Sequence, residues 1–264
     1  MKKMKTQVPV LVLVSAALTA VAQGGTIVHM DRRDSDDGKA RPQSMIYAQD
    51  GQFRMDTLDA AGHVRDFVLV RDGNIWQVDM EKRTFMQIDR AALSGKQSEM
   101  QDRMHAMLQS LPPETRAAME ARMQGMMAGR SQPAFTMTDS GKSDQVGRWS
   151  CEIWQVRRGE KVSSDACIAS RGSLEGGDEL VDAVHKAATT ASGVLSAIPA
   201  THAAAQRMAI YGQANGFPVR TRELEGAKVE SELTVSSIEH RSLPADQFAI
   251  PKGFTQTTMG GGNE

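Results

Sequence analysis

The sequence is poor in aromatic residues and cysteine, and it lacks the motifs of several common enzyme classes. Aromatic residues make up 5% of the 264 residues, and there are two cysteines. The absence of His-Glu-x-x-His excludes a zinc protease of that type, and the absence of Gly-x-Ser-x-Gly excludes the usual serine-hydrolase elbow. The six histidines are scattered, without the spacing of a metal site. We therefore expect a protein that is not an enzyme and uses no cofactor.

The first 22 residues have the composition of a secretory signal peptide. Three lysines come first, residues 8–18 are apolar, and Ala20-Val21-Ala22 matches a small-x-small cleavage site. The apolar stretch is too short to span a membrane, and no later stretch approaches that length. Gln23 follows the expected cut, where a lipid-anchored protein would have cysteine. The sequence therefore predicts a periplasmic protein that is cleaved near Ala22 and does not span the membrane.

The charge of the mature chain argues against nucleic acid as a partner. The full sequence has 31 basic and 32 acidic residues and a formal net charge of −1. The predicted signal peptide contains three lysines and no acidic residue, so its removal changes the charge from −1 to −4. A mildly acidic protein has no net attraction for a phosphate backbone or an anionic membrane surface.

The two cysteines are expected to form a disulfide, because exported proteins mature in an oxidising compartment. Residues 150–156 and 161–169 have the character of strands joined by a turn at Gly159. Cys151 and Cys167 are equidistant from Gly159, so they should face each other across the hairpin. A redox-active pair is the alternative, but it would normally have Cys-x-x-Cys spacing.

Short apolar segments separated by turn signals predict an antiparallel sheet. Asp50-Gly51 is a strong signal for a two-residue hairpin, whereas residues 31–42 are polar and are expected to form a loop. The predicted strands are Thr26–Met30, Ser44–Gln49, Gln52–Leu58, His63–Val70, Asn74–Met80, Thr84–Ile88, Ala134–Asp139, Ser150–Val156, Lys161–Ala169, Phe217–Leu224 and Ala227–Ile238.

Residues 89–130 have helical periodicity and contain many methionines. Pro112-Pro113 divides them into two helices, which we interpret as a helical hairpin inserted into the sheet. The first helix has an apolar stripe of Met100, Met104, Met107, Leu108 and Leu111, and the second has Met119, Met123, Met126 and Met127. A third helix is expected at Asp178–Leu195, with the stripe Leu180, Val184, Ala187, Ala191 and Val194, and a shorter one at Thr201–Tyr211.

The methionine stripes are compatible with three roles. Methionine is a flexible side chain that fills irregular gaps, so one role is simple packing against other elements. It also suits surfaces that accept apolar partners, which predicts a docking site for another protein. Thioether sulfur is a ligand for Cu(I), so Met119, Met123, Met126 and Met127 are a candidate copper site.

Five segments resemble a family of exported bacterial proteins of unknown function, in or near the LolA/LolB-like superfamily of lipoprotein carriers. They are LPPETRAAMEARM, WSCEIWQVRRGEKVSSDACIA, GGDELVDAV, GFPVRTRELEGAKVESELTVSSIEH and the closing LPADQFAIPKGF. The resemblance covers most of the mature chain, and the closing segment, residues 243–254, is its most specific part. It implies an α+β fold in which a strongly curved antiparallel sheet, a half-open barrel, wraps around helices.

At the level of fold, the resemblance implies a binding protein that holds a lipid, a lipoprotein acyl chain or another apolar ligand on the concave face of the sheet. The candidate lining residues, which are equally good core residues, are Trp76, Val78, Phe85, Leu233 and Val235. We expect one domain over residues 23–255, with the helical insert at about 89–130, followed by a flexible tail at 256–264.

Overall fold

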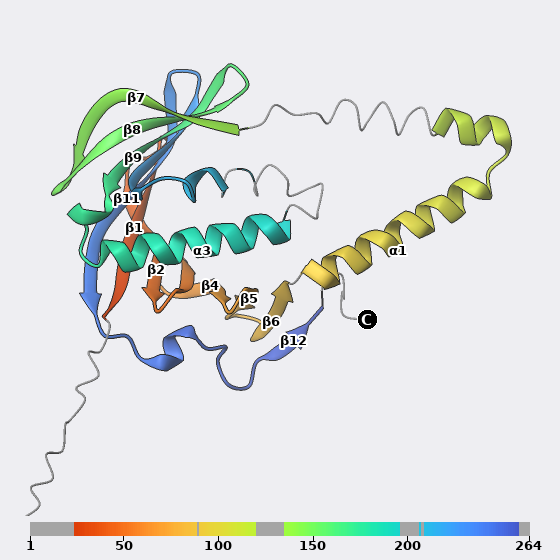
Figure 1. Ribbon diagram of the computed structural model, residues 1–264, viewed down its shortest axis with the longest axis horizontal. Helices are drawn as coiled ribbons and strands as arrows, with labels where there is room; N and C mark the ends of the chain where they lie inside the picture. The colour runs from red at the N-terminus through yellow and green to blue at the C-terminus, as the bar shows by residue number, and fades with distance from the viewer. Residues whose placement is uncertain (1–23, 89, 120–134, 196–205, 207–208, 259–264) are drawn as a thin grey trace, which may run out of the picture.

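Twelve strands in the described part of the chain form one sheet, which curves around helix α3 (Figure 1). The computed structural model describes residues 24–88, 90–119, 135–195, 206 and 209–258. The strand order is β12-β6-β5-β4-β3-β2-β1-β11-β10-β9-β8-β7. The strands are β1 (Gly25–Asp34), β2 (Ala40–Gln49), β3 (Gln52–Leu58), β4 (Val64–Arg71), β5 (Asn74–Asp79), β6 (Thr84–Ile88), β7 (Phe135–Val146), β8 (Trp149–Arg158), β9 (Lys161–Ser170), β10 (Gly216–Glu225), β11 (Lys228–Arg241) and β12 (Thr255–Thr257).

In the described part of the chain, the two long helices are α1 (Arg90–Gln109) and α3 (Gly177–Leu195), and two short 3-10 helices are η1 (Arg171–Ser173) and η3 (Ala245–Phe248). Asp178 and Glu179 lie in the first turn of α3, where negative charge is favourable because it faces the positive end of the helix dipole. Within the described ranges, no helix combines the length and the apolar character needed to cross a membrane.

The apolar stripe predicted for α3 is confirmed, and it faces the sheet. Leu180 and Val181 are fully buried in a core cluster with Val28, Ala48 and Val219 from three strands. Farther along the helix, Ala187, Ala191 and Val194 pack against Val70 and Ile75. The helix thus fills the space inside the curve of the sheet.

The closing segment crosses the opposite face of β2–β6 as a strap, which we define as residues 243–254. Leu243 and Phe248 of the strap are buried against Phe67, Leu69 and Val78. The closing segment therefore covers this face with apolar side chains. Arg54 Nη1 and Arg71 Nη1 donate hydrogen bonds to the main-chain oxygens of the strap at Gln247 (2.9 Å) and Phe248 (2.7 Å).

The sheet is mostly antiparallel, as predicted, but it is mixed and it is not closed into a barrel. After the strap, β12 runs parallel to β6, with Thr255 opposite Thr84. β12 and β7 remain as the two edges of the sheet. The first two residues of the flexible tail predicted at 256–264 therefore belong to a paired strand, because the strap returns the chain to β6.

Two predicted boundaries are wrong because strand pairing overrides polar sequence. Residues 31–42, predicted as a loop, belong largely to β1 and β2, since Arg33 pairs with Glu232 on one side and with Ala40 on the other. The strand predicted to end at Asp139 continues as β7 to Val146. In contrast, the predicted hairpin at Asp50-Gly51 is confirmed, with φ values of 52° and 68° at the two turn residues.

Helix α1 follows β6 and extends away from the sheet (Figure 1). Residues 113–119 are also helical, but the rest of the predicted second helix lies outside the described residues. The same is true of the signal peptide, of residues 259–264 of the predicted tail and of most of the helix predicted at 201–211. The pairing of the two methionine-rich helices as a hairpin stays a prediction.

Candidate ligand-binding cleft

A cleft lies at the β7 end of the sheet, between strands β7–β9 and the segment that precedes β10. Its volume is about 990 Å³. The lining residues are Phe135, Thr136, Met137, Ser143, Ser150, Cys151, Glu152, Trp154, Ile168, Ser170, Ile210, Gln213, Ala214 and Asn215.

The middle of the cleft wall is built from alternate residues of β8. Successive side chains of a strand point to opposite faces, so Ser150, Glu152 and Trp154 share the face that lines the cleft. On β9, Ile168 lies opposite Glu152 and Ala166 lies opposite Trp154. Ala166, Ile168 and Ala214 form a small buried cluster against which Trp154 packs. The cleft therefore has an apolar inner wall.

An irregularity in β7 keeps this strand on the cleft wall. The pairing of β7 with β8 shifts between Asp139 and Lys142, and the hydroxyl of Ser140 donates a hydrogen bond to the main-chain oxygen of Ile153 at 2.6 Å. Gly141 adopts a φ of 68°, which glycine accepts without strain. The chain can therefore resume pairing and bring Ser143 beside Glu152.

The predicted disulfide between Cys151 and Cys167 is confirmed, and it crosslinks the two strands behind the cleft. The Sγ atoms are 2.00 Å apart and the Cα atoms 5.2 Å apart. The predicted register, however, is wrong: Cys167 lies opposite Ile153. The turn is centred between Gly159 and Glu160, since Arg158 pairs with Lys161, and the β8–β9 pairing shifts by one further residue at Val156/Arg157. The cysteines are therefore diagonal neighbours across the hairpin.

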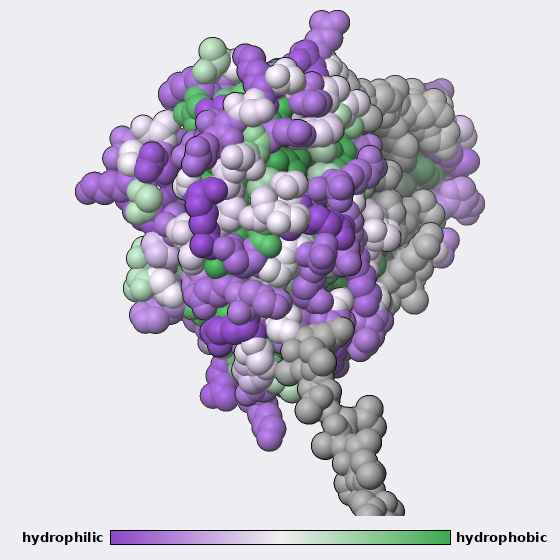
Figure 2. All heavy atoms as spheres, turned by 60° about the vertical axis from the view of Figure 1, so that its left-hand side comes forward, coloured by the Kyte–Doolittle hydropathy of each residue, from purple (hydrophilic) through white to green (hydrophobic). Residues whose placement is uncertain are grey.

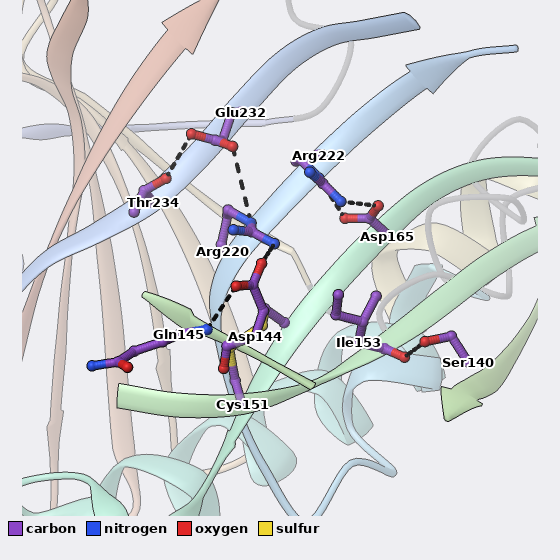
Figure 3. Close-up of polar contacts among 11 residues, drawn as sticks. Ser140, Asp144, Gln145, Cys151, Ile153, Asp165, Arg220, Arg222, Glu232 and Thr234 are labelled. Atoms are coloured by element: carbon purple, nitrogen blue, oxygen red, sulfur yellow. Dashed lines mark hydrogen bonds and ion pairs between the residues drawn. A yellow bond between two sulfur atoms is a disulfide. The ribbon is translucent and has the colours of Figure 1, made fainter. Parts of the chain in front are cut away.

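On the side of the sheet that carries the disulfide, a cluster of ion pairs joins β10 to β7, β9 and β11 (Figure 3). Arg220 of β10 donates a hydrogen bond to Asp144 of β7 at 2.8 Å, and its Nε lies 3.9 Å from Glu232 of β11. Arg222 contacts both carboxylate oxygens of Asp165 at 2.9 and 2.7 Å. Because Asp144 and Ser143 are consecutive in β7, the Arg220 contact also fixes the position of Ser143 at the cleft.

The charges of this cluster stabilise one another. The hydrogen bond from Arg220 lowers the pKa of Asp144 from its ordinary value of 3.8, with further contributions from the main-chain amide of Gln145. The contact with Asp165 raises the pKa of Arg222. Asp144 and Arg222 are therefore charged over the whole physiological pH range. The ion pairs thus have a structural role, because they link neighbouring parts of the sheet.

The five lining residues predicted from the sequence lie in two core clusters and do not line this cleft. Trp76, Val78 and Phe85 belong to the cluster beneath the strap. Leu233 and Val235 belong to the cluster beneath α3. Val78 is fully buried, so a ligand could contact it only by displacing the chain's own side chains. Their role in ligand binding stays a prediction.

Two methionines of the helical region are exposed to solvent. Met107 is 50% exposed, and Met119, in the following helical residues, is 38% exposed, whereas Leu108 is buried. Met123, Met126 and Met127 lie outside the described residues, so the candidate copper site stays a prediction. In the described part of the chain, no group of three or more His, Cys, Asp or Glu side chains is arranged to hold a metal ion.

The face seen in Figure 2, which corresponds to the left side of Figure 1, is mainly hydrophilic. Hydrophobic residues appear there as small areas between charged and polar side chains. An extended apolar patch would mark an interface with a protein or a membrane. Nothing of that size is visible on this face.

Comparison with known proteins identifies a family. A family described as a domain of unknown function, DUF4412, matches residues 108–254, more than half of the chain. The chain belongs to this family. The match confirms the resemblance to a family of unknown function, and it includes the cleft, the disulfide and the strap of this DUF4412 protein. No curated protein sequence matches the chain significantly.

Several solved structures are distantly similar to this DUF4412 protein. An uncharacterised conserved protein from Thermus thermophilus has a TM-score of 0.43 and 11% identity, over 90% of this chain and 91% of that one. For the MucA/MucB complex of Pseudomonas aeruginosa, the TM-score is 0.35 and the identity 10%, over 86% of this chain and 56% of that one. For the LolA superfamily protein NE2245 from Nitrosomonas europaea, the TM-score is 0.31 and the identity 7%, over 86% of this chain and 89% of that one. Similarities at this level leave the function of the chain open.

Proposed function

We propose that this chain is an exported, non-enzymatic binding protein of the periplasm that holds a lipid or another apolar ligand in the cleft. The observation that carries the proposal is the cleft itself. Its volume of about 990 Å³ is at the upper end of the range for small-molecule sites, roughly 300–1,000 Å³. Its inner wall contains an aromatic side chain and a buried apolar cluster. The Cys151–Cys167 disulfide supports an oxidising compartment.

Native mass spectrometry of the protein, purified from the periplasm without detergent, tests this proposal. We expect a bound mass that disappears after extraction with organic solvent. Ser150→Trp places a large side chain at an exposed position of the cleft and should abolish the bound mass. Ser35→Trp, at an exposed turn outside the cleft, is the matched control and should retain it. A bare mass in repeated preparations, or equal retention by both variants, would overturn the proposal.

A second candidate function is docking of a protein partner on the methionine-rich helices. The exposure of Met107 and Met119 favours it, because plain packing would bury these side chains. Met107→Glu combined with Met119→Glu should abolish crosslinking to a periplasmic partner. Met55→Glu is the matched control, since Met55 on β3 is 37% exposed. Crosslinking that survives the double change would exclude this role.

A further inference from the structure

The side chains that line the cleft are sorted by polarity along β8. Near the start of β8, Ser150 and Glu152 line the cleft, and Ser143 of β7 lies opposite Glu152. Farther along β8, Trp154 lines the cleft, and Met137 of β7, which also lines it, lies opposite Val156. Along β8, the lining side chains therefore change from polar to apolar, although Ile168 of β9 lies opposite Glu152 and the polar Thr136 lies between Phe135 and Met137.

Solvent exposure follows the same gradient. Ser143, Ser150 and Glu152 are exposed, whereas Trp154 and Met137 are half-buried. A strand rises about 3.3 Å per residue, so the wall from Ser150 to the end of β8 at residue 158 is roughly 26 Å long. Along β8, the cleft wall is thus long and changes from exposed and polar to half-buried and apolar.

The polar end has a defined charge. Glu152 is the one ionisable side chain that lines the described cleft. None of the hydrogen bonds or ion pairs among the described residues uses its carboxylate, whereas the nearby Asp144 is engaged by Arg220. Arg158, six residues farther along β8, stacks on the ring of Phe135 at 5.4 Å. The carboxylate of Glu152 is therefore available to a ligand.

We propose that the cleft takes an amphiphile whose head group ends in an ammonium group. The ammonium group lies at Glu152, where the serine hydroxyls accept further hydrogen bonds, and the hydrocarbon chain extends over Trp154 toward Met137 and Phe135. Charge complementarity selects this head group, because an anionic head would meet the unpaired carboxylate. This inference rests on the proposed function and adds the chemical class of the ligand.

Isothermal titration with two twelve-carbon probes, each below its critical micelle concentration, tests the inference. The probes are dodecylammonium, which is cationic, and dodecanoate, which is anionic. We expect the cationic probe to bind about fivefold more tightly, as an exposed ion pair contributes up to about that factor. In Glu152→Gln the two affinities should become equal. Glu160→Gln, an exposed carboxylate at the β8–β9 turn, is the matched control and should keep the preference.

The outcomes separate this inference from the proposed function. Equal binding of both probes to the wild type, or a preference that survives in Glu152→Gln, overturns the head-group assignment and leaves the cleft as an apolar site. Absence of binding by both probes overturns the proposed function as well. Trp154→Ala should weaken both probes by a similar factor, about tenfold, because it removes the apolar wall and leaves Glu152 in place. Unchanged affinity in that variant would show that the probes bind elsewhere.

Discussion

The two ends of the sheet are held together in different ways. At the β2–β6 end, the strap covers one face and closes it with buried side chains such as Phe67 and Phe248. At the β7–β9 end, a cleft of about 990 Å³ remains, and the strands are joined by a disulfide and by ion pairs of Arg220 and Arg222.

This difference shows how the fold can keep a cleft without losing its edge strands. Burial of apolar side chains stabilises a sheet but fills its surface. Covalent and ionic links between strands leave the opposite face free. Beneath the strap, even charged groups are covered. The Cζ atom of Arg54 lies 3.8 Å from the centre of the Phe67 ring, and the side chain of its ion-pair partner Asp56 is 1% exposed. Burial raises the pKa of Asp56, although Arg54 opposes this effect.

The largest effect should come from the filled end. Phe67→Ala removes a fully buried ring and should lower the free energy of unfolding by about 4 kcal/mol, through lost burial and the cavity left behind. Trp154→Ala, at the half-buried cleft wall, should cost only about 1 kcal/mol. Urea unfolding of both variants measures the difference. Equal losses would contradict the view that the two ends differ in how they are held.

An intermediate effect is expected from the disulfide. Cys151→Ala combined with Cys167→Ala opens a loop with a sequence separation of 16 and should lower the free energy of unfolding by about 3 kcal/mol. Because the link lies behind the cleft, the change should also weaken binding of the twelve-carbon probes. Reduction of the wild type should reproduce both effects. A loss of stability with intact binding would show that the ion pairs alone maintain the cleft.

The smallest effect concerns Asp144 at acid pH. Because Arg220 lowers the pKa of Asp144 below its ordinary value of 3.8, its stabilising contribution is complete above that value and is lost as the pH falls through the lower folded-state pKa. Urea midpoints measured below pH 4 should therefore fall less steeply in Asp144→Asn than in the wild type. Identical acid profiles for Asp144→Asn and the wild type would contradict this role.

Much of the fold could be predicted from local sequence. The hairpin at Asp50-Gly51 and the stripe of α3 were predictable because each depends on neighbouring residues, through turn geometry or helical periodicity. The extension of β7 was missed because it depends on a turn conformation at Gly141 and on Arg220, 76 residues away in the chain from Asp144. A contact between residues so far apart in the sequence leaves no pattern in a short stretch of sequence.

The cleft was not predicted, although part of its wall was visible as the alternation of Ser150, Glu152 and Trp154. Alternation tells that these side chains share a face, but it does not tell whether that face is filled. Trp76 and Val78 have the same alternation, and the strap covers them.

The sequence by itself determined the features that depend on neighbouring residues, which are the turns, the apolar stripe of α3 and the pairing of the two cysteines. It also determined the family. The tertiary structure decided the register of the disulfide, the parallel return of β12 and the choice of which face stays open. The physical reason is that turns and periodicity are set by residues a few positions apart. Closure of a face depends on where a distant segment, here the strap or the residues before β10, is placed against it.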